Sequence, residues 1–348
     1  MMTAIELGLI YAVMALGVYL TFRILDFADL TVDGSFTTGA SIAALSIVNG
    51  VPPALATSLA LVGGMAAGLV TGLLHTKGRI NGLLAGILTQ IALYSVNLRI
   101  MGKANMPLLR EETLISPLKH LGWVGEWQSV GIFMVVAAVI LLLIIWFLHT
   151  DLGLAMRATG DNPDMIRSFG VNTDNQKMLG LALSNGLVAL CGAIIAQYQG
   201  FADIGMGIGL IVAGLASVII GQAIMGRSSV PIAATAVVLG SVLYRVVIFL
   251  ALKAGLNPND MKLISAVLVV LALVLPQWHP FARLARGLDW LARETGLYHL
   301  LQSEGFARFA RRTGLARLAR WKGFDRLRAV IRTRVAALTD TGLVEKEG

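Results

Sequence analysis

The sequence predicts an all-α fold, a polytopic helical membrane protein with about eight to ten transmembrane helices. Composition is the first reason: 56% of the 348 residues are hydrophobic and 14% are charged, whereas a soluble domain has about 45–50% apolar and about 25% charged residues. The second is a mean hydropathy of +0.76. The third is that apolar stretches close to the ~20 residues that cross a bilayer recur along the chain.

These apolar stretches define the expected elements in order. The first, at about 5–22, lacks a basic leading region and a small-residue cleavage site, so we expect a retained span rather than a signal peptide. A shorter stretch at about 36–48 follows a polar segment, which predicts a discontinuous second helix. Glycines within the spans, Gly63, Gly64, Gly68 and Gly72, are expected to serve helix packing. The remaining stretches lie at about 54–74, 83–100, 130–149, 179–198, 205–225, 230–252 and 263–276.

Charge divides the chain into two domains. Residues 1–280 contain 14 Lys and Arg against 13 Asp and Glu, whereas residues 281–348 contain 14 against 7. Because basic segments stay on the cytoplasmic side, we expect a cytoplasmic C-terminus, and nine simple crossings would then place the N-terminus outside. The loops expected inside are those around Lys77 and Arg79, at 151–178 and around Arg227, and those expected outside are at 101–128, 200–204 and 253–262.

The domain 281–348 is expected to be a basic amphipathic tail. Apolar and Arg positions recur in it at helical spacing, which is typical of a helix lying on an anionic membrane surface. A disordered, dispensable extension is the main alternative. A nucleic-acid partner is not expected, because the sequence has no recognised binding module. The apolar positions include Phe306, Phe309, Leu315, Leu318, Trp321 and Phe324, and the basic ones Arg308, Arg311, Arg312, Arg317 and Arg320.

Within the transmembrane domain 1–280, the loop 150–178, which we expect on the cytoplasmic side, contains a polar, Gly-punctuated island from Asp151 to Asp174. We expect the chain to meet a soluble partner there. The island carries the start and stop signals of a helix of about two turns over roughly 163–169. The N-cap, the first-position proline, the acid at the positive dipole end and the terminating glycine are Asn162, Pro163, Asp164 and Gly170. Such a helix would expose a knob suited to a groove on another protein, and a solvated loop is the alternative. The knob residues are Met165, Ile166 and Phe169, with Arg157 and Arg167 beside them.

The segment 26–35 sets three carboxylates between apolar stretches, which is costly in lipid unless they line water or cap a helix. Asp33 is expected to cap the short helix that follows it. Phe27-Ala28-Asp29-Leu30 is echoed by Phe201-Ala202-Asp203-Ile204, and in the expected topology the two copies start from opposite faces of the membrane. An inverted repeat with a path between the copies would account for this, and chance similarity is the alternative.

Further polar side chains lie inside the predicted spans. Two interpretations stay open for them: snorkelling of Arg245 with helix-to-helix hydrogen bonds of the amides Gln90, Asn97 and Asn185, or a polar lining of a translocation pathway. The candidates for the pathway or the helix break are Asp29, Asp33, Gly34, Ser35, Asn97, Asn185 and Arg245.

Several chemistries have no counterpart in the sequence. It has no phosphate-binding Gly-x-x-x-x-Gly-Lys-Ser/Thr loop and no Gly-x-Ser-x-Gly nucleophile motif, so we expect no ATPase or other enzyme activity in the chain itself. The five His residues are scattered without metal-ligand spacing. Cys191, the only cysteine, is expected to be a buried small hydrophobe. We therefore expect no catalytic residue, cofactor or metal site in this chain.

Three segments carry a family resemblance. The first is Arg23-Ile24-Leu25-Asp26-Phe27-Ala28-Asp29-Leu30-Thr31-Val32-Asp33-Gly34-Ser35, the second contains Arg157-Ala158 and Phe169-Gly170-Val171-Asn172-Thr173, and the third is Ala213-Gly214-Leu215-Ala216-Ser217-Val218-Ile219-Ile220-Gly221 with Gly240-Ser241. Over roughly residues 5–280 the chain resembles permease subunits of ATP-binding cassette (ABC) importers of the branched-chain amino acid and ribose type. Branched-chain members tend to have Asn-Phe-Ala-His-Gly in the first segment, so Asp-Leu-Thr-Val-Asp-Gly-Ser is more similar to relatives associated with uptake of tryptophan or other aromatic amino acids. The family lacks the basic tail, so the resemblance implies nothing about it.

The resemblance implies a permease in the bacterial inner membrane that pairs with a second copy or a sister permease. Two ABC ATPase subunits, which hold ATP and Mg²⁺, would dock on the cytoplasmic island, and a periplasmic or lipid-anchored binding protein would deliver the solute. The expected solute is an amino acid, with an aromatic one such as tryptophan favoured. Three alternatives stay open: an ABC importer for a nucleoside, vitamin or sugar, an ion-coupled secondary transporter that uses the intramembrane Asp and Arg groups, and a scaffold anchored by its tail.

Overall fold

Most residues of the computed structural model, which describes residues 1–226, 229–255, 263, 265–267 and 269–270, are helical. The first helix, α1 (Met2–Tyr19), continues into a π-helical turn, η1 (Leu20–Ile24), and the chain then leaves helical geometry until Thr31. Two short strands, β1 (Asn105–Pro107) and β2 (Phe201–Asp203), pair antiparallel. The other helices are α2 (Thr31–Val48), α3 (Pro53–Thr76), α4 (Gly82–Met101), α5 (Ser116–His120), α6 (Trp127–Leu148), α7 (Asp151–Asp161), α8 (Pro163–Ser168), α9 (Thr173–Gln199), α10 (Leu210–Met225) and α11 (Val230–Lys253).

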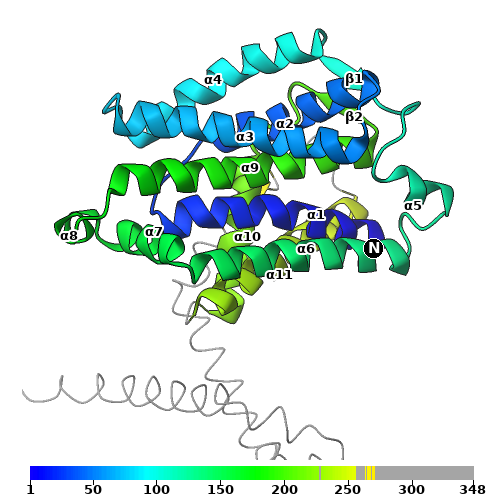
Figure 1. Cartoon of the computed structure of the whole chain (residues 1–348). Coiled ribbons are helices and arrows are strands. Elements are labelled where there is room, and N and C mark those ends of the chain that lie inside the picture. The colour runs from blue at the N-terminus through cyan, green and yellow to red at the C-terminus, as the bar shows by residue number, and fades with distance from the viewer. Residues whose placement is uncertain (227–228, 256–262, 264, 268, 271–348) are drawn as a thin grey trace, which may run out of the picture. The chain divides into compact units, whose positions relative to one another are not determined.

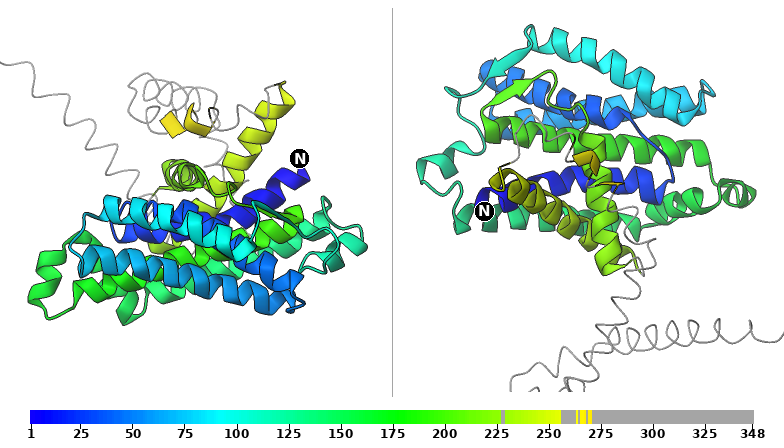
Figure 2. Two further views of the ribbon diagram at one scale, coloured as in Figure 1. Left: turned by 90° about the horizontal axis from the view of Figure 1, so that it is seen from above. Right: turned by 180° about the vertical axis from the view of Figure 1, so that it is seen from behind.

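Helix α9 lies at the centre of the domain and packs against α1, α2 and α3. Figure 1 shows the helices in parallel rows on both sides of α9. On one side α4 covers α2 and α3, and on the other side lie α1 and α6. Helices α10 and α11 pack against each other and against α1, and Figure 2 shows them crossing one face of these rows. Because α1 is the most buried of the candidate spans (83%), the first apolar stretch forms a core helix of the bundle.

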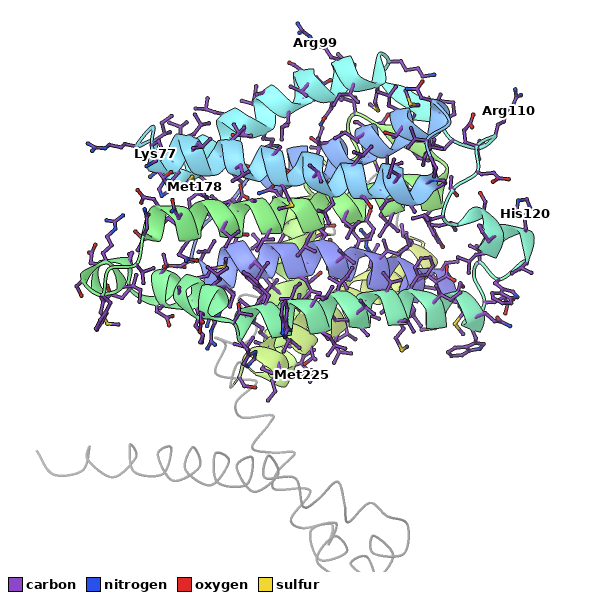
Figure 3. The ribbon with its side chains drawn as sticks, in the orientation of Figure 1. Lys77, Arg99, Arg110, His120, Met178 and Met225 are labelled. Carbon is purple, nitrogen blue, oxygen red and sulfur yellow. The ribbon has the colours of Figure 1, made fainter. Side chains whose placement is uncertain are left out.

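The bundle has two chemically distinct ends, which we name after the short helices that mark them. The α8 end carries α7, α8 and Lys77, and the α5 end carries α5, Arg110 and the paired strands (Figures 1 and 3). The sequence places the island and the Lys77 loop on one side, and the segments 101–128 and 200–204 on the other, and the structure confirms both groupings. Arg227 and most of the loop 253–262 lie outside the described residues.

Glycines let the central helices approach closely. A Cβ atom on Gly39 of α2 or Gly64 of α3 would collide with Ala189 of α9, and one on Gly68 would collide with the carbonyl oxygen of Leu181. Gly63 and Gly72 likewise face Ile42 and Met178, so the packing role predicted for these glycines is confirmed. On the far side of α9, Cys191 is fully buried, as predicted, and its thiol donates to the carbonyl of Ile10 (3.3 Å).

The structure confirms the polytopic helical fold, and every apolar stretch predicted before residue 263 forms a helix. Among the described residues, six helices are long and apolar enough to cross a membrane. The stretches predicted at about 36–48 and 205–225 correspond to α2, which has 18 residues and is rich in hydroxyl side chains, and to α10, which has 16 residues. The break expected near the second helix lies at Leu25–Leu30. Most of the predicted span 263–276 and the whole tail 281–348 lie outside the described residues.

Candidate functional site

A network of hydrogen bonds joins the helix break to α2 and α9. The Asp29 carboxylate accepts from the backbone N–H of Thr31 (2.9 Å) and from Nδ2 of Asn185 (2.6 Å), and the Ser35 hydroxyl donates to Oδ1 of Asn185 (2.7 Å). Asp29 is 3% exposed, and Asn185 and Ser35 are fully buried. Asn185 lies twelve residues into the 27-residue α9, so this mid-depth network occupies the middle of the bundle. Buried polar groups are tolerated there because each finds a partner.

Asp33 caps a different helix from the one the sequence suggests. It lies in the first turn of α2, and its carboxylate accepts from the backbone N–H groups of Gly209 (2.7 Å) and Ile211 (2.8 Å) at the start of α10. The prediction that Asp33 caps the helix following it is therefore wrong, because the Asp29 carboxylate already binds the Thr31 N–H at that position. A carboxylate at the positive end of α10 stabilises the start of that helix.

The two segments that echo each other in sequence lie at different ends of the bundle. The ring of Phe27 contacts the ring of His75, near the end of α3 that leads into the Lys77 loop. Phe201–Asp203 is β2, which pairs with β1 at the α5 end. This placement fits the predicted opposite starting points, and the inverted repeat itself stays a prediction. Beyond β2, Gly207 packs against the carbonyl of Asp33 in the first turn of α2.

The other polar candidates take two different places. Asn97 of α4 is 1% exposed and donates from Nδ2 to the carbonyl of Gly34 (3.3 Å), so it lies beside the start of α2, where Gln90 lines the same cavity. Arg245 of α11 instead lays its guanidinium 3.5 Å from the ring centre of Tyr11, a cation–π contact inside the bundle. Tyr11 in turn stacks on Phe36 at 6.0 Å. Arg245 therefore contacts α1, and the rings of Tyr11 and Phe36 lie between it and the mid-depth network.

The island forms two helices, where the sequence predicts one. Helix α8 begins and ends at the predicted signals: Asn162 accepts from the Met165 N–H (3.0 Å), Pro163 is its first residue, and Gly170 has a positive φ of 85°. It has no buried residue, and it exposes Met165 (52%) and Phe169 (73%). Helix α7 is missed by the sequence analysis, although Thr150 caps it by accepting from the Gly153 N–H (3.3 Å).

The two island arginines lie in different surroundings. Arg167 donates to the hydroxyl of Thr173 (2.6 Å) and forms an ion pair with Asp174 (3.1 Å), both at the start of α9. Arg157 lines a polar cavity of about 410 Å³ with Arg23 and Asp26, at the end of η1. The exposed apex of α8 is therefore Met165 and Phe169, together with the exposed carboxylate of Asp164, while Ile166 is half-buried.

Glu6 is a buried carboxylate that the sequence analysis passes over. It is 0% exposed near the start of α1, and it accepts from the Gly125 N–H (2.8 Å), the Tyr198 hydroxyl (2.7 Å) and the Ser129 hydroxyl. These contacts tie the segment before α6 to α1 and α9 at the α5 end. The sequence did contain a signal for this site, because an acidic residue inside the first apolar stretch is costly to bury in lipid unless it finds polar partners.

Interrupted helices that meet at buried carboxylates in the middle of a multi-span bundle are typical of membrane transport proteins. The family described as "Branched-chain amino acid transport system / permease component" matches residues 1–274. The chain belongs to this family, and the resemblance stated from its sequence is confirmed.

The chain is also similar to individual proteins. A "Tyrosine transport system permease protein" of Clostridioides difficile is 44% identical over 263 residues, which cover 76% of this chain and 86% of the relative. An "Autoinducer 2 import system permease protein" of Salmonella typhimurium is 33% identical over 109 residues, or 31% of this chain and 30% of the relative. Among solved structures, PsaBC from Streptococcus pneumoniae matches 78% of this chain and 88% of its own at 18% identity, with a TM-score of 0.46.

Proposed function

We propose that this chain is the translocation subunit of an ABC importer that moves an aromatic amino acid across the inner membrane. Membership of the permease family, together with 44% identity to a tyrosine transport permease, carries the proposal. The chain itself supplies the pathway and no catalysis. ATP and Mg²⁺ belong to the partner ATPase.

Helix α8 is the proposed contact with the ATPase. Its apolar residues Met165 and Phe169 stand clear of the bundle, and burial of such side chains in a partner's groove is favourable because it removes apolar surface from water. Movement of α8 would be transmitted through α7, since Gly160 packs tightly on the carbonyl of Ile24, immediately before the helix break. Binding of the ATPase to the island would thereby shift the helix break at Leu25–Leu30 between an outward-open and an inward-open state of the pathway.

The opposite end is the proposed entry side. A periplasmic or lipid-anchored binding protein would dock on the segment that contains α5, where Leu109 (82%) and Leu121 (60%) are exposed. Glu6 holds this segment against α1 and α9. A second copy or a sister permease would complete the pathway. The tail 281–348 would bind the anionic surface of the membrane on the cytoplasmic side and would take no part in transport.

The proposal is tested by purification of the chain in detergent from a membrane that also contains its ATPase. The variant Met165→Asp with Phe169→Asp should lose the ATPase while the permease stays folded, because α8 buries nothing inside the chain. The matched control is Leu109→Asp with Leu121→Asp, which alters two exposed leucines at the other end and should retain the ATPase.

Retention of the ATPase by the α8 variant would contradict the docking role. Uptake assays on the purified complex in vesicles then address the class of transporter. ATP-dependent import of L-tyrosine or L-tryptophan supports the proposal, whereas transport by the chain alone without ATP would replace it with a secondary transporter.

A further inference from the structure

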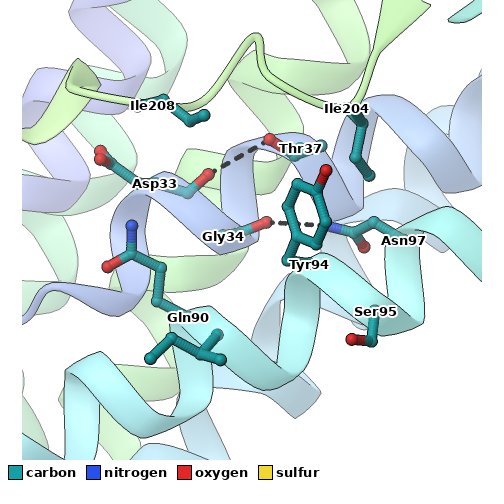
Figure 4. A pocket seen from close by; sticks show the side chains of 10 residues that line it. Asp33, Gly34, Thr37, Gln90, Tyr94, Ser95, Asn97, Ile204 and Ile208 are labelled. Carbon is teal, nitrogen blue, oxygen red and sulfur yellow. Dashed lines mark hydrogen bonds between the residues drawn. The ribbon is translucent and has the colours of Figure 1, made fainter. Parts of the chain in front are cut away.

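Two cavities among the described residues differ in the chemistry of their walls. The cavity beside the start of α2, shown in Figure 4, is lined in part by polar side chains that include Thr37, Gln90 and Ser95. A second cavity, of about 310 Å³, is lined entirely by aliphatic and aromatic residues and one glycine. It lies between α3 and α6, which Figure 1 shows on opposite sides of α9, and we call it the α3–α6 groove.

Helix α9 forms the floor of the groove. Leu183, Leu187 and Leu190 recur there at helical spacing and are half-buried, on a helix that otherwise packs against α1, α2 and α3. On the α6 side, Leu143 and Trp146 line the groove and are 56% and 68% exposed, so the groove has an open side. A molecule that touches the floor must therefore enter between α3 and α6.

The groove lies at membrane depth, in the half of the bundle nearer the α8 end. Helices α3, α6 and α9 are all candidate spans, and the α6 residues that line the groove lie between Ile140 and Phe147, close to the end of that helix. This stretch rises about 10 Å, which is less than the roughly 15 Å of hydrocarbon in one leaflet. Tryptophan is enriched at the membrane interface, and Trp146 lies at this end of the groove. The groove therefore runs along one leaflet, from near its interface toward the middle of the membrane.

The wall of the groove favours a hydrocarbon occupant. A solute with amino, carboxyl or hydroxyl groups would find almost no hydrogen-bond partner there, which is costly away from water. A helix from another chain is too large, because one turn about 10 Å wide occupies roughly 400 Å³. An empty groove would lose the dispersion contacts of its lining atoms. A single acyl chain is narrow, flexible and already present in the surrounding bilayer, so it meets all three conditions.

We propose that the α3–α6 groove binds one acyl chain of a phospholipid from the leaflet at the α8 end. Lipid tails and leucine side chains are similarly apolar, so the groove binds the chain through the fit of its shape and not through a hydrophobic gain. The chain would contact Leu20 of η1, the turn that leads into the helix break. The bound lipid thereby becomes part of the wall beside that turn, whichever solute the protein moves.

The experiment maps lipid contacts on the full permease–ATPase complex in vesicles. A small share of the phosphatidylcholine carries a photoreactive diazirine within one acyl chain, and peptide mass spectrometry locates the label after illumination. Any surrounding lipid should label exposed residues such as Leu88 on α4 and Val135 on α6. Only a chain inside the groove should also label Leu183 and Leu190 on the floor. Label on the exposed residues without label on the floor would refute the site.

Two variants that fill the groove sharpen this test. Leu183→Trp and Leu190→Trp each place a bulky ring on the floor, and label at the other floor residue should fall about tenfold, because overpacking denies space to the chain. Leu88→Trp makes the same substitution at a position that is 44% exposed and outside the groove, and it should leave floor labelling unchanged. Undiminished floor labelling in both filling variants would overturn the proposal. The result for the unaltered chain stands even where a filling variant does not fold.

A protein occupant gives a different result. If a helix of another subunit fills the groove, the floor residues should be protected from the lipid in the complex and labelled in the isolated chain. That outcome would assign the groove to a partner chain and refute the lipid site. Equal floor labelling in the complex and in the isolated chain supports the bound acyl chain.

Discussion

The mid-depth network and helix α8 place polar and apolar side chains in opposite ways. Around Asp29 and Asn185, charged and amide groups are buried in an apolar bundle, and each has partners from a distant part of the chain. On α8, large apolar side chains are exposed at the surface, and the helix buries none of its own residues. The hydrogen bonds of the network join residues that are far apart in the sequence, so the network depends on the packing of the helices. The bonds that cap α8 are local, and its exposed apolar side chains are available for contact with another protein.

The largest effect should come from filling a glycine contact near the network. In Gly39→Val, the new side chain would collide with the backbone of Ala189, and overpacking of this kind should destabilise the domain by about 3 kcal/mol or more. Thermal unfolding in detergent measures the loss. Gly131→Val on α6, where a Cβ meets nothing within 4 Å, is the control and should unfold near the temperature of the unaltered chain.

The next effect should come from removing an amide of the network. Asn185→Leu deprives Asp29 and Ser35 of their shared partner, and a buried carboxylate that loses a hydrogen bond should cost about 2–3 kcal/mol. Asn175→Leu changes the same residue type at an exposed position of α9 and should have little effect. If both variants unfold alike, the network contributes nothing and the comparison fails.

A smaller effect is expected at the α5 end. Glu6→Gln keeps the shape of the side chain but leaves one acceptor oxygen for three donors, from Gly125, Ser129 and Tyr198. We expect a loss of about 1–2 kcal/mol, with faster hydrogen exchange in the segment before α6. Unchanged exchange there would show that Glu6 does not hold that segment.

The smallest effect is expected beside α8. Arg167 and Asp174 form an ion pair at 3.1 Å with side chains 54% and 35% exposed, so Arg167→Ala should cost about 0–1 kcal/mol, and less at high salt. A double-mutant cycle with Asp174→Ala isolates the pair. A coupling as large as the Asn185→Leu effect would remove the contrast between the two regions.

Local signals predicted α8 well because they act within a few residues. The Asn162 cap, Pro163 at the first position and Gly170 at the end all lie where the sequence places them. Helix α7 was missed because its glycines and polar residues resemble a loop, although Thr150 caps it and Gly153, Met156 and Thr159 are buried against neighbouring elements. Apolar composition also does not reveal that α10 is only 16 residues long.

The sequence by itself determined the membrane class, the order of the apolar helices, the family and the cap signals of α8, because composition, periodicity and motifs are written in neighbouring residues. The tertiary structure decided which helix Asp33 caps, which hydroxyls bind Glu6, and which backbone carbonyl accepts from Asn97. Asp33 and Gly209 are 176 residues apart, and Glu6 and Tyr198 are 192 apart. Such pairs depend on which helices cross and at what depth, which no local pattern records.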